Sequence, residues 1–282
     1  MPVRHYPDWE SFEIAPGASD SPVAFGADLS PASVLGAYRR GIIPFPAPGE
    51  HFRTINEFRF EDQVADGTIG LVGEAVSGRD GPGDDPYGVA WWSPDPRPVL
   101  SVGQVHLGRN VRKQLRRGDL RTTANTRFRQ VAEECRAGRE PRWLTDSLLG
   151  SLIELHQEGW AHSVEVWLDG ELVGGAMGIG IGRTISGDSL FGRRPGAAAI
   201  AVADLAARLG QAGGLLVDAQ WDSPFLRSLG AAPMPRERYL PVLGLSAEPI
   251  ALPAQPLSAR RLSLGAVTVT TVSDVVGETS DT

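Results

Sequence analysis

A β-hairpin between residues 163 and 179 is the feature that most constrains the fold. Apolar and polar residues alternate over 163–168, the dipeptide Asp169-Gly170 follows, and a second apolar run covers 171–179. A period of two is typical of strands, and Asp-Gly favours the tight two-residue turn that joins antiparallel neighbours. The segment therefore predicts two paired strands, and any fold for this chain must include them in a sheet.

The residues that follow the hairpin alternate between strand and helix signals. Thr184 to Leu190 predicts a third strand, the Ala-rich stretch 197–209 predicts a helix, and 215–219 is a short apolar run typical of a strand buried inside a sheet. The run of glycines at 178, 180 and 182 lies inside the strand segment, so it is not interpreted as a nucleotide-binding loop. This order predicts an α+β or α/β core, a mixed sheet with flanking helices.

Two further helices are predicted nearer the N-terminus. One begins at Pro31 with Ser30 as its cap and ends at Gly41, and the other covers 146–157. We expect three parts in the 282-residue chain, because a domain usually has about 100–200 residues. They are a small N-terminal α+β domain over 1–103 with an acidic insertion at 54–90, a larger domain over 104–243, and a partly disordered tail over 244–282.

The charge of the chain is unevenly distributed. The formal net charge is −7, which argues against a protein that binds polyanions over its whole surface. Residues 104–142 nevertheless contain eleven basic and four acidic residues, whereas 54–90 contains two basic and eight acidic ones. If residues 109–116 are helical, four cations share one face, and they are predicted to contact a polyanion or to form a solvated face. These four are Arg109, Arg112, Lys113 and Arg116.

The single cysteine and the N-terminal residues bear on location. Cys135 has no partner for an intramolecular disulfide and no Cys or His at metal-ligand spacing. The first residues include Asp and Glu where a signal peptide needs an apolar run, and no 18-residue apolar stretch occurs. We expect a soluble cytoplasmic protein that acts as a monomer, without a membrane partner and without a metal.

Polar residues at two strand ends could carry chemistry. Asp218 and Gln220 lie at the end of the buried strand, and Asp188 lies near the end of the third strand. A carboxylate can accept a proton, and an adjacent amide can position a nucleophile, although an Asp at this place can also cap a turn. Separately, residues 193–198 resemble the acyl-CoA pyrophosphate loop of GCN5-related N-acetyltransferases, or form an ordinary helix start.

Several longer motifs together resemble one family. The chain is similar, over about residues 24–241 without the acidic insertion, to the leucyl/phenylalanyl-tRNA–protein transferases. The motifs are Gly26-Ala-Asp-Leu-Ser-Pro31, Trp91-Trp-Ser-Pro-Asp-Pro-Arg97, Trp143-Leu-Thr145, Ala161-His-Ser-Val-Glu-Val-Trp167, Gly187-Asp-Ser-Leu-Phe191 and Val217-Asp-Ala-Gln220.

The resemblance implies both a fold and an activity. The larger domain would have the GCN5-related N-acyltransferase fold. The protein would move Leu or Phe, with Met as a further candidate, from aminoacyl-tRNA to the N-terminal Arg or Lys of a protein, marking it for degradation, with no cofactor. Asp218, Gln220 and Asp188 would be catalytic, and the four cations above would contact the tRNA backbone. Substrate-binding residues would be Tyr38, Phe45, Trp143, Ala176, Ile185, Leu190, Val202, Leu209 and Val217.

The chain departs from the family pattern at several of these positions. Asp188 replaces a Glu, Phe45 replaces a Trp, and Ala198-Ala199 replaces a Ser-Lys pair. The last change leaves Arg-x-x-Gly-x-Ala at the start of the helix. Two alternatives therefore stand beside the transferase: an acyl-CoA-dependent N-acyltransferase, and a non-catalytic relative that binds tRNA.

Overall fold

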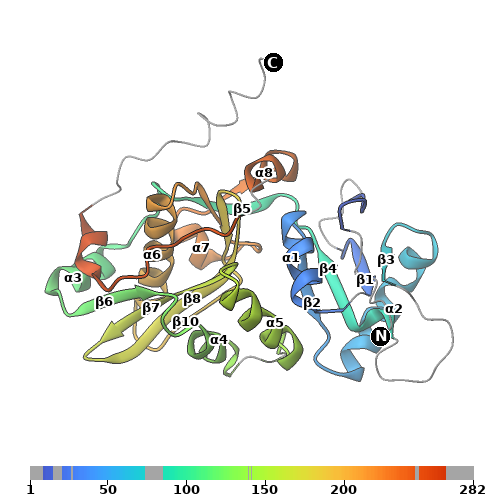
Figure 1. The fold of residues 1–282 in the computed structure, drawn as a ribbon, viewed down its shortest axis with the longest axis horizontal. Helices are drawn as coiled ribbons and strands as arrows, with labels where there is room; N and C mark the ends of the chain where they lie inside the picture. The colour runs from blue at the N-terminus through green and yellow to red at the C-terminus, as the bar shows by residue number, and fades with distance from the viewer. Residues whose placement is uncertain are drawn as a thin grey trace, which may run out of the picture. The chain divides into compact units, whose positions relative to one another are not determined.

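A computed structural model describes most of the chain (Figure 1). The described residues are 9–14, 21–26, 28–73, 85–138, 140, 142–244 and 248–264. The chain divides into two compact units, the first formed by Met1–Asp95 with Gly138–Leu155 and the second by Pro96–Ala137 with His156–Thr282. Both units combine helices with a sheet, so the protein is a mixed α+β protein.

The first unit contains a four-stranded sheet in the order β2-β4-β1-β3. Its first helix begins where the sequence predicts, because Ser30 Oγ accepts a hydrogen bond from Ser33 N at 3.3 Å and Pro31 opens the first turn. The elements are β1 (Ala24–Gly26), α1 (Pro31–Arg39), β2 (Ile43–Pro46), α2 (Glu50–Ala65), β3 (Gly70–Val72), the 3₁₀ turn η1 (Pro86–Gly88) and β4 (Val89–Trp92).

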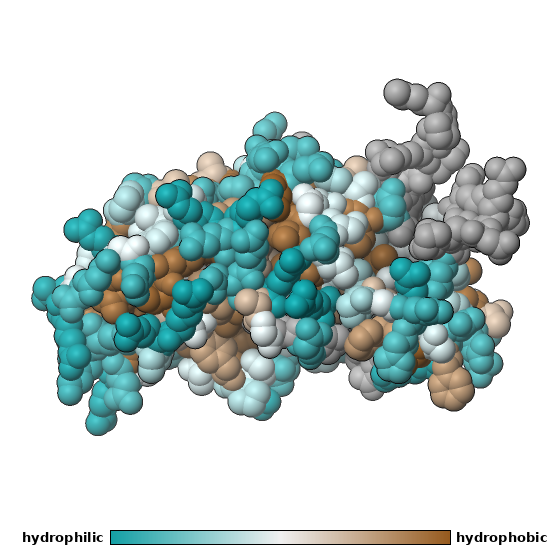
Figure 2. Space-filling model, turned by 90° about the horizontal axis from the view of Figure 1, so that it is seen from below, coloured by the Kyte–Doolittle hydropathy of each residue, from teal (hydrophilic) through white to brown (hydrophobic). Residues whose placement is uncertain are grey.

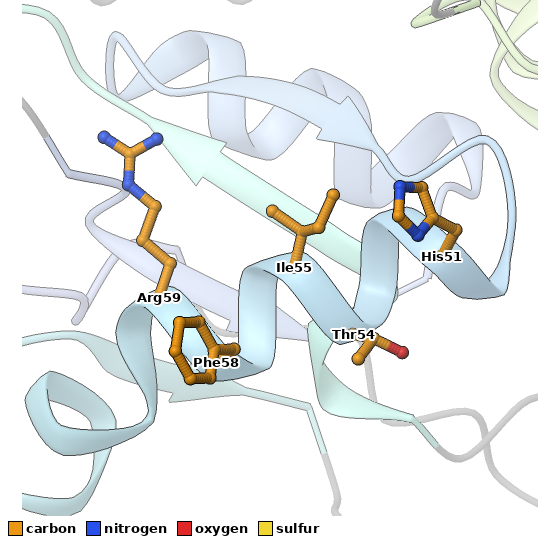
Figure 3. A pocket seen from close by; sticks show the side chains of 5 residues that line it. All are labelled: His51, Thr54, Ile55, Phe58 and Arg59. Atoms are coloured by element: carbon orange, nitrogen blue, oxygen red, sulfur yellow. The ribbon is translucent and has the colours of Figure 1, made fainter.

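The acidic stretch 54–90 contributes to the framework of this unit. It supplies most of α2 and all of β3, and β3 pairs in parallel with β1. Helix α2 buries Phe60 against the unit's aromatic core but leaves Ile55 43% and Phe58 85% exposed. Figure 3 shows Ile55 and Phe58 on α2, beside His51, Thr54 and Arg59. Residues 74–84, which include the predicted flexible tip, lie outside the described residues.

The second unit is built on a mixed nine-stranded sheet. Its order is β12-β5-β11-β9-β8-β7-β6-β13, and β10 pairs with β8 beside this path. The strands are β5 (Arg97–Ser101), β6 (Leu120–Ala124), β7 (Ala161–Leu168), β8 (Glu171–Ile181), β9 (Thr184–Ser186), β10 (Ser189–Gly192), β11 (Leu216–Asp218), β12 (Ala232–Met234) and β13 (Leu257–Ser258).

The predicted hairpin is confirmed as β7 and β8. These strands pair antiparallel from Ala161 opposite Ile179 to Leu168 opposite Glu171. Asp169 and Gly170 have φ values of 52° and 82°, and two positive φ angles in succession are what a two-residue type I′ turn requires. The glycine run also lies where the sequence placed it, in β8 and in the turn after it.

The predicted third strand is wrong as a single element. The chain forms β9 over 184–186 and β10 over 189–192, and the two are separated by Gly187 and Asp188. The break arises because the two halves have different partners. Strand β9 pairs with the end of β8 and with β11, whereas β10 pairs with the middle of β8. Asp188 is therefore in the two-residue connection between these strands.

Helices cover both faces of this sheet. A Cβ on Gly174 would approach the Ala197 Cβ of α6 to 2.7 Å, whereas one on Gly175 would approach Val131 Cγ1 of α4 to 3.2 Å. Since successive strand residues point to opposite faces, α6 and α4 lie on opposite sides of β8 (Figure 1). The helices of this unit are α3 (Arg109–Arg117), α4 (Phe128–Arg136), α6 (Ala197–Gln211), α7 (Pro224–Ser228), α8 (Arg236–Leu243) and the 3₁₀ turn η2 (Ala259–Ser263). Helix α5 (Asp146–Gln157) belongs to the first unit except for its last two residues.

The hydrophobic core of the second unit lies between α6 and the sheet. On the surface, Figure 2 shows many hydrophilic residues on the face seen from below. Helix α5 has the predicted bounds, with Thr145 Oγ1 accepting from Leu148 N at 3.4 Å. Of the tail, residues 248–264 are described and include β13, which pairs with β6. Residues 265–282 lie outside the described residues. None of the helices in the described ranges is long and apolar enough to cross a membrane.

Candidate active site

Asp218, the last residue of β11, is enclosed by hydrogen-bond donors. Its Oδ2 accepts from Arg97 Nη1 at 2.7 Å and from the Tyr239 hydroxyl at 2.9 Å, and its Oδ1 accepts from Gln220 N at 2.8 Å. The side chains of Asp218 and Arg97 are each only 1% exposed. A buried carboxylate needs this number of donors, because its charge is costly to remove from water.

Arg97 and Tyr239 also contact each other. The Arg97 guanidinium carbon lies 4.5 Å from the centroid of the Tyr239 ring, a cation–π arrangement. Burial opposes the charge of Arg97, but the adjacent Asp218 outweighs this effect and raises the pKa of Arg97 above its ordinary value. Burial, and then Asp218, raise the pKa of Tyr239. Arg97 is thus charged and Tyr239 protonated, so both donate to Asp218.

Gln220 is held in an uncommon backbone conformation. Its φ is 57°, in the left-handed region that non-glycine residues rarely occupy. The hydrogen bond from Gln220 N to Asp218 Oδ1 fixes this turn, so Asp218 caps the turn as the simpler sequence interpretation also allowed. Such strain is retained where the surroundings impose it, and it is common at functional sites.

The side chain of Gln220 connects this cluster to Asp188. Gln220 Nε2 donates to Asp188 Oδ1 at 2.5 Å, and Gly187 N donates to Asp218 O at 2.7 Å. Asp188 is half-buried, whereas Gln220 is only 5% exposed. The structure therefore brings together all three residues expected to be catalytic, in the order Asp218, Gln220, Asp188, with Asp188 the most accessible.

The six apolar residues expected to line a pocket lie in one hydrophobic core. Leu190 is opposite Ala176 across β10 and β8, and Val217 is opposite Ile185 across β11 and β9. Five of the six are nearly fully buried, and Leu190 is half-buried at the side of the same core. The two others, on one face of α6, are Val202 and Leu209.

The three aromatic residues expected to bind an adenosine all belong to the first unit. Phe45 and Trp143 have ring centroids 6.0 Å apart with an interplanar angle of 38°. Both are half-buried and can present ring surface, whereas Tyr38 is 6% exposed.

The predicted basic face is helical. Helix α3 spans Arg109–Arg117, and its cations at 109, 112, 113 and 116 are exposed. At the other candidate anion site, residues 193–198 precede and begin α6, but Arg193 forms an ion pair with Glu134 of α4. Within the described residues, no group of three His, Cys, Asp or Glu side chains is arranged to hold a metal ion.

Sequence reasoning missed Arg97 and Tyr239 as parts of the site. Arg97 ends the Trp91–Arg97 motif, so its place in a specific motif was a usable signal. Tyr239 had no comparable signal, because it reaches Asp218 from α8, 21 residues along the chain.

The fold and the site define a mixed α+β protein in which a buried Arg–Asp–Tyr cluster holds a strained glutamine against a half-buried aspartate. Residues 99–244 match the family model of leucyl/phenylalanyl-tRNA protein transferase. Proteins named leucyl/phenylalanyl-tRNA–protein transferase are similar to most of the chain. The one from Saccharophagus degradans is 35% identical over 78% of this chain and 77% of its own length. Those from Aromatoleum aromaticum (36%; 83% and 84%) and Idiomarina loihiensis (34%; 87% and 91%) are comparable. The chain belongs to the leucyl/phenylalanyl-tRNA–protein transferase family.

Proposed function

We propose that this protein transfers Leu or Phe, with Met as a further candidate, from aminoacyl-tRNA to the N-terminal Arg or Lys of a protein and so marks that protein for degradation. Membership of the family supports the reaction class. The observation that supports chemistry in this chain is the hydrogen bond between Gln220 Nε2 and Asp188 Oδ1, in a turn fixed by Asp218. We place this activity in the cytoplasm and assign it to a monomer with the GCN5-related N-acyltransferase fold.

The reaction requires little from the protein beyond positioning. The α-amine attacks the ester carbonyl carbon, the C–N bond forms, and the C–O bond to the tRNA ribose breaks. One proton leaves the nitrogen and one reaches the ribose oxygen. No ATP is consumed in this step. Since an ester is already activated towards an amine, orientation and stabilisation of the oxyanion supply most of the rate increase.

Each polar residue then has a distinct role. Gln220 Oε1 accepts an N–H of the attacking amine while Gln220 Nε2 remains on Asp188. Asp188, which Gln220 contacts, accepts the proton released as the C–N bond forms. Asp218 acts as a positioning residue, because Arg97, Tyr239 and Gln220 N occupy its oxygens.

The binding residues follow the family resemblance. The side chain of the transferred amino acid enters between Leu190 and the core that contains Val202 and Val217. The half-buried rings of Phe45 and Trp143 hold the terminal adenosine by stacking, which contributes about 1–3 kcal/mol per base. Tyr38 is too buried to stack on a base. The cations of α3 contact the tRNA backbone.

The test is transfer of radiolabelled Leu or Phe from charged tRNA to a peptide that begins with Arg, with an acetylated peptide of the same sequence as control. We expect transfer to the free peptide alone. Asp188→Asn keeps the shape of the side chain and removes the charge, and it should slow single-turnover transfer by about 100-fold or more. Absence of transfer to any Arg or Lys peptide would contradict the proposal.

Two other activities remain distinguishable by binding. An acyl-CoA-dependent enzyme would release heat on titration with acetyl-CoA, and in this chain the first arginine of the 193–198 loop forms an ion pair with Glu134. A non-catalytic relative would bind acylated and deacylated tRNA equally. We expect no heat with acetyl-CoA and tighter binding of the acylated form.

A further inference from the structure

A groove of about 800 Å³ lies in the second unit, lined mainly by residues 102–107, α6 and residues 261–264 of the η2 segment, with Arg112 from α3. This volume is within the range of about 300–1,000 Å³ that is typical of ligand sites. Its floor is formed by small residues of α6, including Ala203, Ala206 and Ala207. Figure 1 shows η2, drawn in red at the end of the described chain, beside α3.

The walls of the groove carry positive charge. Arg112, Arg183 and Arg261 line it together with His106, and among the described residues that line it none is Asp or Glu. A concave surface with charges of one sign focuses the electrostatic potential and attracts ligands of the opposite sign. The groove therefore suits an anion.

Two of these arginines keep donors for a ligand. Arg183 is oriented by the hydrogen bond from its Nε to Gly213 O at 3.1 Å, and no other part of the described chain pairs with its terminal nitrogens. Arg261 donates to Asp204, but Asp204 also pairs with Arg208. One carboxylate thus serves two guanidiniums, and an excess positive charge remains in this wall.

The cations continue outside the groove. Arg112 lines it and also belongs to the exposed basic face of α3 that contains Arg109, Lys113 and Arg116. A series of spaced cations that leads into a groove fits a chain of phosphates better than a single small anion.

We propose that this groove is a second contact site for the sugar–phosphate backbone of tRNA, in which Arg183 and Arg261 bind phosphates beyond the face of α3. The inference rests on the proposed function. The inference extends the tRNA site to a wall formed by η2. This element lies C-terminal to residues 99–244, which match the family model.

The test compares two leucyl donors, leucyl-tRNA and leucyl-adenosine, and the second has no phosphate. Arg183→Glu reverses one charge of the groove. Arg260→Glu is the matched control, because Arg260 is exposed on η2 but does not line the groove. We expect Arg183→Glu to raise the KM for leucyl-tRNA about tenfold and leave kcat/KM for leucyl-adenosine unchanged, whereas Arg260→Glu changes neither by more than about twofold.

Binding of uncharged tRNA gives a second readout. Loss of one phosphate contact should lower the slope of log K against log salt concentration by about 0.7–0.9 in Arg183→Glu. The proposed phosphate site would be contradicted by equal effects on both donors, by equal effects of the two variants, or by no effect of Arg183→Glu. Failure of the wild-type protein to transfer Leu from either donor would instead contradict the proposed function.

Discussion

Asp218 shows how one buried charge can organise a site. Its oxygens are occupied by a guanidinium, a phenol and a backbone N–H, and these come from β5, α8 and the turn after β11. An ion pair inside a protein costs desolvation energy, so it is weak support for stability by itself. Here Asp218 fixes the backbone of Gln220 in the left-handed region, which a non-glycine residue rarely adopts.

Removing a donor from Asp218 should therefore affect both stability and transfer. We expect Arg97→Met to lower the free energy of unfolding by about 3–5 kcal/mol, because it leaves Asp218 buried without its cation. Tyr239→Phe should cost about 1.5–3 kcal/mol, the range for a hydrogen bond to a charged group. Urea unfolding measures both. Arg227→Met is the control, since the pair of Arg227 with Asp222 is exposed and should contribute less than about 1 kcal/mol.

Tyr239→Phe also separates positioning from folding. At a temperature where the variant is fully folded, we expect single-turnover transfer to fall while the KM for leucyl-tRNA stays unchanged. Transfer at the wild-type rate in this variant would contradict the role of the cluster.

His162 is a second buried polar residue with a measurable consequence. Its Nδ1 lies 3.2 Å from Asn125 Nδ2, its side chain is buried, and Nε2 has no partner among the described residues. Burial, and then the nearby His156, lower the pKa of His162 to about 4. The unfolded chain binds this proton with a pKa of about 6.5.

The direction in which stability changes with pH follows from the proton that is taken up on unfolding. Between about pH 6.5 and pH 4 the unfolded state binds a proton that the folded state does not, so stability falls as the pH falls. Over this window the loss should approach about 3 kcal/mol, since one pKa unit corresponds to about 1.36 kcal/mol. The His162→Gln variant has no titrating group at this position. Between about pH 6.5 and pH 4 its free energy of unfolding should therefore fall by about 3 kcal/mol less than that of the wild-type protein. Identical pH profiles would rule out this role.

At the scale of elements, helix α2 has one buried side chain, Phe60, and exposes the apolar side chains of Ile55 and Phe58. Phe60 is 5% exposed and packs on Phe25 and Trp92, whereas Phe58 is 85% exposed. Figure 3 shows Phe58 beside Ile55 on α2. Phe60→Ala should cost about 3–5 kcal/mol by leaving a cavity. Phe58→Ala should change stability by less than about 0.5 kcal/mol. Thermal unfolding of the two variants measures the difference, and equal losses would contradict the assigned packing.

The elements that sequence predicts well are those with local signals. Ser30-Pro31 fixes the start of α1 and Asp169-Gly170 fixes the β7–β8 turn. A cap at Thr145 or Asp146 and a stop at Gly159 give the bounds of α5. The break at Gly187-Asp188 was not predictable, because alternation indicates a strand but not its partner, and here the partner changes. The same limit applies to the site. Asp188, Gln220 and Asp218 were proposed from motifs, whereas Arg97 and Tyr239 reach Asp218 only through the tertiary fold.

At the scale of the whole molecule, a net charge of −7 conceals its distribution. The cations of α3 and of the groove belong to the second unit, and the acidic stretch 54–90 belongs to the first. Net charge is thus a poor guide to a nucleic-acid partner when the charges of opposite sign lie in separate units. Long-range attraction is screened beyond about 8–10 Å at physiological salt, so local patches determine binding.

Within the second unit, Asp204 joins the C-terminal segment to α6 and β6. This residue of α6 is fully buried, pairs with Arg208 at 2.6 Å and with Arg261, and accepts from Thr122 Oγ1 at 2.8 Å. Arg208 in turn donates to the carbonyl oxygens of Pro253 and Gln255. Helix α6, strand β6 and residues 253–261 are therefore held by one network.

Asp204→Asn should release this segment. The variant keeps the shape of the side chain but leaves two guanidiniums without their shared counter-charge, so we expect a loss of about 3–5 kcal/mol and faster amide exchange in β13 and η2 than in β7 or β8. Hydrogen exchange followed by mass spectrometry measures this difference. Asp169→Asn is the matched control, because it makes the same change at the exposed hairpin turn, where Asn tolerates the positive φ. Unchanged exchange in 257–263 in Asp204→Asn would show that other contacts hold the segment, because pairing of β13 with β6 would then persist without the network.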